Sequence, residues 1–269
     1  MTPPRVLSIA GSDSGGGAGI QADLKAFARC GVHGMTAITA ITAQNTVAVT
    51  AVYPVAPEAI VEQVRAVAED IGVDAVKIGM LGTTETIEAV ARALDLVGAV
   101  PVVLDPVMVA ESGAVLLDES ARAALRERLV PRATVVTPNI AEARVLSEAG
   151  EDASPQELAR AVHALGPKTI VVTGGHREEV TDLFFDGTSL VEIPGERYPG
   201  GAAHGSGCIH SSALAAHLAL GLAPVDAARR AKEIASEAVR DGLRDIGAGA
   251  GPVDSIGALR RGDGQPPLA

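Results

Sequence analysis

The sequence has 269 residues, 47% of them hydrophobic and 20% charged, a composition that supports a buried core and excludes wholesale disorder. A net charge of -11 and only 2% aromatic residues, with no tryptophan, argue against nucleic acid and anionic membranes as partners. The two cysteines have no metal-ligand spacing, and no secretion signal or membrane-spanning stretch is recognisable, so we expect a cytoplasmic protein without disulfides.

Short β-branched runs alternate with amphipathic helical patterns along most of the chain, which predicts an α/β fold with a mainly parallel sheet covered by helices. Antiparallel strands are expected to extend the sheet at 46–55 and at 180–193. Residues 260–269, rich in glycine and proline, are expected to form a loosely ordered tail. A chain of this length and pattern is expected to form one domain, residues 1–269. The predicted strands are 6–10, 37–43, 75–78, 102–104, 134–136 and 170–172, and the predicted helices are 20–29, 57–70, 84–96, 120–129, 155–165, 205–220 and 224–243.

The first predicted strand runs into a glycine-rich turn between Gly11 and Gly19, which implies close approach of the backbone to a ligand. The turn matches neither the dinucleotide fingerprint nor a Walker A loop, and a flexible connection is the plain alternative. Asp23 on the following helix is either a solvated helix residue or a carboxylate that accepts hydrogen bonds from an amine or hydroxyl of a substrate.

Polar residues follow the next strands, at the edge where parallel sheets bind ligands. The amide of Gln44 suits a heterocycle edge with a ring nitrogen and an amine, although a loop cap is equally consistent. Asp105 ends a strand and is placed to hold Mg²⁺, or it simply opens an Asp-Pro turn. Asn139 and Glu142 face the same side of a first helical turn, where they can orient Mg²⁺ waters, form a capping box, or do both.

Two glycine turns in the second half of the chain suit phosphate groups. The paired glycines after Thr173, Gly174 and Gly175, permit close approach of a nucleotide phosphate. Gly205-Ser206-Gly207-Cys208 opens a long helix, so backbone N–H groups and the positive helix end can stabilise a transferring phosphoryl group. Cys208 is either a base, with a thiolate favoured by the helix N-terminus, or a small residue that packs the helix start.

In this order, the motifs resemble those of the hydroxymethylpyrimidine and phosphomethylpyrimidine kinases of thiamine biosynthesis, which have the ribokinase-like fold. The resemblance implies a three-layer α/β/α fold, ATP and Mg²⁺ as cofactors, a small pyrimidine substrate and a homodimer. The motifs that carry it are Ile9 to Lys25, Ile38-Thr39-Ala40, Ala43-Gln44-Asn45-Thr46, Lys77-Ile78-Gly79-Met80-Leu81, Asp105 to Ala110, Thr137-Pro138-Asn139, Gly174-Gly175-His176 and His204-Gly205-Ser206-Gly207-Cys208.

The resemblance also implies roles for individual residues. Substrate binding falls to Gln44, Asp23, Gly11, Met80 and Val107. The remaining roles are nucleotide binding by Asn139, Glu142, Thr173, Gly174 and Gly175, Mg²⁺ binding by Asp105 and Glu142, an anion hole at Gly205, Ser206 and Gly207, and a catalytic base at Cys208.

Two departures from the family pattern remove positive charge. Thr173 stands where a lysine usually precedes Gly-Gly-His, and Glu111 replaces a lysine of the flap, so Arg177, Lys77 or a metal would have to compensate. The leading function is ATP-dependent phosphorylation of 4-amino-5-hydroxymethyl-2-methylpyrimidine, its monophosphate, or both. Pyridoxal kinases share the fold, but Gln44 favours the pyrimidine. A weakly active pyrimidine-binding relative is the third alternative.

Overall fold

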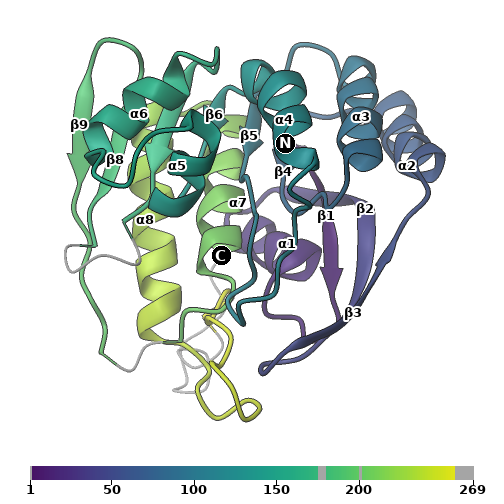
Figure 1. Ribbon diagram of the computed structural model, residues 1–269. Coiled ribbons are helices and arrows are strands. Elements are labelled where there is room, and N and C mark those ends of the chain that lie inside the picture. Colours follow the sequence, from purple (N-terminus) through teal and green to yellow (C-terminus); the bar gives the residue numbers. More distant parts are fainter. Residues whose placement is uncertain (1, 175–179, 200–201, 258–269) are drawn as a thin grey trace.

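The computed structural model describes residues 2–174, 180–199 and 202–257, and within them one nine-stranded sheet has the order β3-β2-β1-β4-β5-β6-β7-β8-β9 (Figure 1). Pairing is parallel from β2 through β1, β4, β5 and β6 to β7, and antiparallel where β3, β8 and β9 extend the two edges. The predicted mainly parallel sheet with antiparallel additions is therefore confirmed. The strands are β1 (Arg5–Asp13), β2 (His33–Gln44), β3 (Val49–Pro54), β4 (Ala75–Ile78), β5 (Val102–Leu104), β6 (Val135–Val136), β7 (Thr169–Val172), β8 (Asp182–Phe185) and β9 (Leu190–Ile193).

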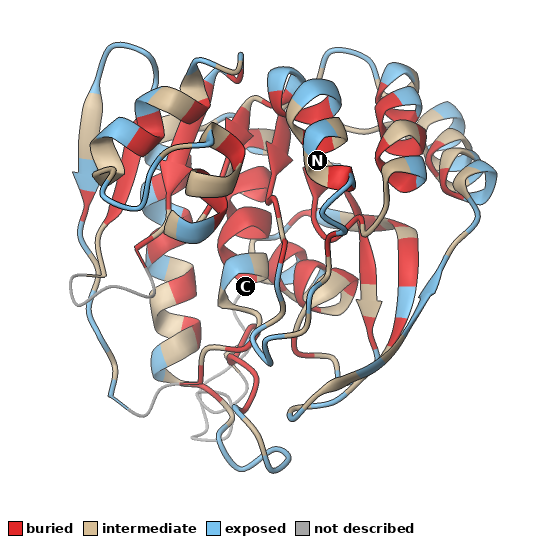
Figure 2. Ribbon diagram, in the orientation of Figure 1, coloured by how far each residue is buried: buried red, intermediate tan, exposed pale blue. Residues whose placement is uncertain are grey.

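Helices cover both faces of the sheet, because alternate residues of each buried strand point to opposite sides. On β1, Leu7 and Ile9 belong to the core cluster that includes residues of α2, α3, α5 and α6, whereas Val6 belongs to the cluster that includes residues of α1, α7 and α8. Figure 2 shows the buried residues concentrated in the strands and on the helix surfaces turned toward them. The helices are α1 (Gly19–Arg29), α2 (Pro57–Asp70), α3 (Thr84–Ala93), α4 (Ala121–Ala124), α5 (Ile140–Ser147), α6 (Pro155–His163), α7 (Ser206–Ala219) and α8 (Pro224–Arg240).

Helix α7 is enclosed by the sheet and by its neighbours α1 and α8, so most of its residues from Ile209 to Leu218 are buried. A helix that is apolar on nearly all sides is typical of a core position. Its first turn lies at the carboxyl edge of the parallel strands, which places a helix N-terminus where ligands of such sheets bind.

The predicted helix at 120–129 differs most from the structure. Only α4 is regular; a wider π-helical turn, Leu125–Leu129, and a 3₁₀ turn, Val130–Arg132, continue it. Pro131 has no backbone N–H with which to extend the helical hydrogen bonding, so the segment ends irregularly. The predicted tail at 260–269 lies outside the described residues. None of the described helices has the length and apolar character needed to span a membrane.

Candidate active site

A cavity of about 770 Å³ opens at the carboxyl edge of the sheet, between the ends of β1, β4, β5, β6 and β7 and the N-terminus of α7. Its volume is in the range of small-molecule and cofactor sites. Most of the residues predicted to form the site line this one cavity. They are Gly11, Gln44, Met80, Asp105, Val107, Asn139, Glu142, Thr173, Gly205, Ser206, Gly207 and Cys208.

Three predicted residues are not part of the lining that the structure describes. Asp23 has no exposed surface and lies beneath the cavity. Gly174 is buried, and its N–H donates to Asp182 Oδ1 at 2.9 Å, so it braces the wall rather than forming it. Gly175 lies outside the described residues.

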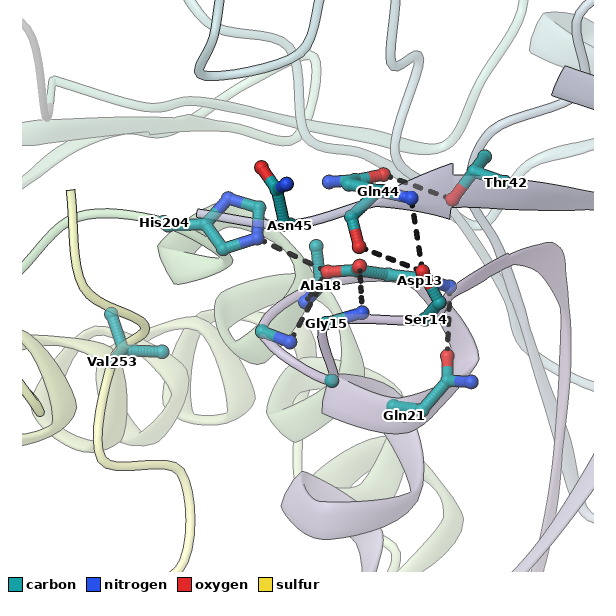
Figure 3. Close-up of polar contacts among 12 residues, drawn as sticks. Asp13, Ser14, Gly15, Ala18, Gln21, Thr42, Gln44, Asn45, His204 and Val253 are labelled. Atoms are coloured by element: carbon teal, nitrogen blue, oxygen red, sulfur yellow. Dashed lines mark hydrogen bonds and ion pairs between the residues drawn. The ribbon is translucent and has the colours of Figure 1, made fainter. Parts of the chain in front are cut away.

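The glycine-rich turn is shaped by the side chain of Asp13, a role that the motif alone did not reveal. Its carboxylate accepts hydrogen bonds from the backbone N–H groups of Gly15 and Ala18 at 2.8 Å and of Gly17 at 3.1 Å, and from His204 Nε2 at 3.1 Å (Figure 3). Burial opposes ionisation, but these bonds keep the pKa of the Asp13 carboxyl below its ordinary value. Asp13 therefore fixes the turn and ties it to the segment before α7.

Glycines bring the turn and the start of α7 into backbone contact. Gly205 has a φ of 87°, and a Cβ there would lie 1.8 Å from Gly17 O. Gly19 has a φ of 56°, and a Cβ there would lie 2.3 Å from Gly11 O. No other residue type fits either position, so the glycines place the start of α1 against the start of α7.

Gln44 ends β2 with its backbone pinned and its amide facing the cavity. Ser14 Oγ donates to Gln44 O at 2.7 Å and accepts from Gln44 N at 2.9 Å (Figure 3). Thr42 Oγ1 lies 3.1 Å from Gln44 Oε1, and Gln44 Nε2 makes no hydrogen bond to any residue that the structure describes. An amide with one unused donor on a fixed backbone is suited to recognising a heterocycle edge.

Asp23 forms a buried ion pair with Lys77, which corrects the expectation that it contacts substrate. Lys77 Nζ lies 2.9 Å from Asp23 Oδ1, and Ser8 and Ser212 donate to the two oxygens of the same carboxylate at 2.6 and 2.7 Å. Lys77 and Ser8 point to the face of the sheet that α1 and α7 cover, and Asp23 is the acid that neutralises the lysine there. With these donors its oxygens are occupied, so Asp23 acts beneath the cavity.

Asp105 and Glu142 form a pair of buried carboxyl groups on one wall of the cavity. Burial raises the pKa of Asp105, although Lys77 and a 2.9 Å hydrogen bond from Ser211 oppose the shift. Burial, reinforced by the negative charge of Asp105, raises the pKa of Glu142 to about 8. Such a pair favours a cation, because a bound cation would offset the cost of ionising two buried carboxyl groups.

The capping box predicted at the start of α5 is confirmed. Glu142 N donates to Asn139 Oδ1, and Asn139 N donates to Glu142 Oε2, both at 2.9 Å.

Among the described residues no three His, Cys, Asp or Glu side chains gather as a metal centre. The donor set therefore fits Mg²⁺ held by one or two carboxylates and completed by water and ligand oxygens.

The start of α7 presents backbone donors to the cavity. No side chain caps this helix. Ser206 N donates to Ala203 O at 3.0 Å. In the first turn of α7, the N–H groups of Gly207 and Cys208 are left without an acceptor among the described residues. Two convergent N–H groups at a helix N-terminus suit an oxyanion or phosphate.

The thiol of Cys208 is protonated in this environment, contrary to the thiolate expected at a helix N-terminus. Burial raises its pKa to about 12; Lys77 and the N–H of Gly19 act in the opposite direction, while the charges of Asp23 and Asp105 add to the increase. Because Asp23 neutralises Lys77, the lysine offsets little of the cost of burial. Cys208 is half-buried and packs against the small apolar cluster of α1 and α8, as expected of a residue that packs the helix start.

The cavity wall also includes residues that the sequence analysis did not assign to the site, among them Asp182, His210 and Lys232. Lys232 Nζ lies 2.6 Å from Asp182 Oδ1. In the sequence, Lys232 looks like a solvated residue of an amphipathic helix, and the only hint was that the chain has just four lysines. Arg177, considered as a compensating cation, lies outside the described residues.

Comparison with known proteins gives consistent matches over nearly the whole chain. A family model described as phosphomethylpyrimidine kinase matches residues 13–254. A hydroxymethylpyrimidine/phosphomethylpyrimidine kinase of Rhizobium meliloti is 51% identical over 92% of this chain and 95% of its own. The pyridoxal kinase from Staphylococcus aureus in complex with ADP superimposes with a TM-score of 0.88 at 34% identity, covering 97% of this chain and 96% of its own. Phosphomethylpyrimidine kinase from Clostridium difficile gives 0.77 at 38% identity, covering 88% and 99%.

Proposed function

The chain belongs to the phosphomethylpyrimidine kinase family, and from this premise we propose how its cavity performs the reaction. The predicted ribokinase-like fold is confirmed, and the chain is an ATP-dependent kinase of thiamine biosynthesis that phosphorylates 4-amino-5-hydroxymethyl-2-methylpyrimidine, its monophosphate, or both. One observation supports the assignment of its parts: the amide of Gln44 and the helix start at Gly207 and Cys208 open into the same cavity.

The pyrimidine binds at the end of the cavity formed by β1, β2 and β4. Gln44 Nε2 donates to the ring nitrogen of the pyrimidine, and Gln44 Oε1, which also lies 3.1 Å from Thr42 Oγ1, accepts from its amine. Met80 and Val107 supply apolar surface for the ring. A side chain at Gly11 would crowd Met80, because its Cβ would lie 3.1 Å from Met80 Sδ, so the glycine leaves room for the pyrimidine. Asp23 supports this end through Lys77 without touching the substrate.

The nucleotide binds across the ends of β6 and β7, against Asn139, Glu142 and Thr173. Asp105 and Glu142 would hold Mg²⁺, which when bound neutralises charge on the phosphates. The N–H groups of Gly207 and Cys208 stabilise the transferring phosphoryl group.

Cys208 acts as the base toward the hydroxymethyl group. The hydroxyl oxygen forms a bond to the γ-phosphorus, the bond from that phosphorus to the bridging oxygen breaks, and ADP leaves with the electron pair. The hydroxyl proton passes to Cys208 Sγ in its thiolate form. The N–H of Gly19 and the Lys77 ammonium lower the cost of forming that thiolate, although burial keeps the pKa near 12 before substrates bind.

A coupled assay of ADP release tests this assignment. We expect Mg²⁺-dependent turnover with the hydroxymethylpyrimidine, with its monophosphate, or with both. Pyridoxal kinase activity is the second candidate, because pyridoxal kinases are among the structures that superimpose well, and faster turnover of pyridoxal would establish it. Pyrimidine binding in calorimetry without any turnover would instead identify a weakly active relative.

We also propose the domain organisation, the oligomeric state and the cellular location of the protein. We take residues 1–269 as a single kinase domain, because one cavity is built from strands and helices along the described chain. A homodimer and a cytoplasmic location follow from the family resemblance and from the cysteine usage. Light scattering and fractionation of cells test these two features.

A further inference from the structure

His210 is a buried histidine on α7 that faces the same cavity as the helix start. It follows Ser206 by four residues and Gly207 by three, so it lies on the same side of the helix one turn later. Only 4% of its surface is exposed, and it belongs to the cavity lining. Neither ring nitrogen has a well-aligned hydrogen-bond partner among the residues that the structure describes. Nε2 faces only the Asp182 carboxylate, and a buried Nδ1 without any partner is costly, which points to a ligand that accepts from it.

Asp182 connects His210 with the strand end that carries Thr173. One carboxylate oxygen, Oδ1, accepts from Gly174 N at 2.9 Å and from Lys232 Nζ at 2.6 Å. The other oxygen, Oδ2, lies 3.2 Å from His210 Nε2. The residue next to Thr173 and the histidine therefore contact the two oxygens of a single side chain. Thr173 and this cluster line the same cavity.

The charge of the cluster favours an anion. Burial disfavours ionisation of Asp182, but His210, Lys232 and the N–H of Gly174 lower the pKa of its carboxyl below the ordinary value. Asp182 and Lys232 cancel each other, so a proton on His210 gives the group a net positive charge. An apolar side chain of similar volume would fill this place without any cost of burying polar atoms.

We propose that His210, held by Asp182 at Nε2, donates its Nδ1–H to a phosphate oxygen of the nucleotide and supplies the positive charge that Thr173 does not. The inference deepens the proposed ATP-dependent function and rests on it. Lys232 contributes by balancing Asp182, which leaves the charge of the imidazolium available to the ligand. The positive charge at the nucleotide thus comes from the interior of α7 instead of from the end of β7.

Calorimetric titration of the full chain with ATP and Mg²⁺, without pyrimidine, tests the proposal. His210→Leu keeps the volume of the side chain and is expected to weaken ATP binding about 10- to 100-fold, while affinity for the pyrimidine changes less than about 2-fold. Thr173→Lys in the His210→Leu background should recover most of the loss, and should gain more there than in the wild type. His217→Leu is the matched control, because His217 lies on the same helix with its Nδ1 already 2.7 Å from Ala213 O and does not line the cavity.

Three outcomes overturn the proposal. The first is wild-type ATP affinity in His210→Leu, and the second is an equal loss in His217→Leu. The third is a loss that Thr173→Lys does not recover although thermal melting shows the variants to be folded. Failure of the proposed function is distinguishable, because it would show as ATP binding without turnover of any pyrimidine. If the wild-type chain binds no ATP, both ideas fail.

Discussion

The role of Cys208 as base leads to a prediction in which the two possible substrates serve as controls for each other. The hydroxymethyl group is an alcohol, so its attack on ATP requires a base. The monophosphate attacks through a phosphate oxygen that has already lost its protons, because the second pKa of such a phosphate is about 6. Cys208 should therefore matter for phosphorylation of the alcohol and much less for phosphorylation of the monophosphate.

The size of the effect follows from the pKa of the thiol. Burial raises this pKa from 9.0 to about 12, so the thiolate fraction at pH 7 falls from about 10⁻² to about 10⁻⁵, a cost of roughly 4 kcal/mol. The reactive form is the deprotonated one, so kcat for the alcohol should rise about tenfold per pH unit between pH 6 and 9 without levelling off. The profile for the monophosphate should be nearly flat above pH 7.

Steady-state ADP release with each substrate, from pH 6 to 9, measures both profiles. Cys208→Ala should lower kcat for the alcohol by about 10²- to 10⁴-fold and leave its affinity unchanged. Cys208→Asp should restore turnover with a profile that levels off at a lower pH than that of the wild type, since the ordinary pKa of a carboxyl group lies well below that of a thiol. Cys30→Ala is the control, because Cys30 is the other thiol with a raised pKa, about 11, and it lies outside the cavity. A flat wild-type profile for the alcohol, or equal losses with both substrates in Cys208→Ala, would refute the reasoning.

Three further predictions concern the groups around the thiol. Asp23→Asn leaves Lys77 without its counter-ion and should lower the free energy of unfolding by about 3–5 kcal/mol in urea titration; unchanged stability would mean that the pair contributes nothing. Gln44→Ala should raise KM for the pyrimidine about 10-fold or more and leave KM for ATP unchanged, and a rise in both would contradict the assignment. Glu142 has a pKa of about 8 in the fold against an ordinary 4.5, so its stabilisation is complete below pH 4.5 and is lost as pH rises through 8. Glu142→Gln should therefore raise Tm at pH 8 in EDTA. The same substitution should abolish the rise in Tm caused by Mg²⁺ with ATP. A lower Tm of the variant in EDTA would show that the ionised Glu142 does not destabilise the fold.

The sheet could be predicted because its signals are local. The predicted strands at 75–78 and 102–104 and the helix at 57–70 agree with the structure to the residue. Proline at the first position of α2 and the uninterrupted apolar runs of buried parallel strands explain this accuracy. The π-helical turn after α4 has no comparable local signal, because it depends on how the chain packs before Pro131.

The site could be predicted where function depends on the backbone and less well where it depends on pairs of side chains. The glycine-rich segments predict that the backbone packs closely there, and at Gly19 and Gly205 the structure shows a close approach of backbone to backbone. The Lys77–Asp23 and Lys232–Asp182 pairs join residues 54 and 50 positions apart, on strands and helices that meet only in the folded chain. Nothing in the local sequence of Asp23 distinguishes a substrate ligand from the counter-ion of a distant lysine.

The pairing of Asp23 with Lys77 has a consequence for how the thiol is held between turnovers. A lysine without a counter-ion beneath Cys208 would lower the pKa of the thiol and leave a thiolate open to oxidation in an accessible cavity. Because Asp23 neutralises that lysine and Asp105 adds negative charge nearby, the thiol stays protonated and unreactive while the cavity is empty. The cost falls on the chemical step, which must supply the energy to form the thiolate. The same balance predicts that iodoacetamide modifies the empty cavity slowly at pH 7 and faster as the pH rises.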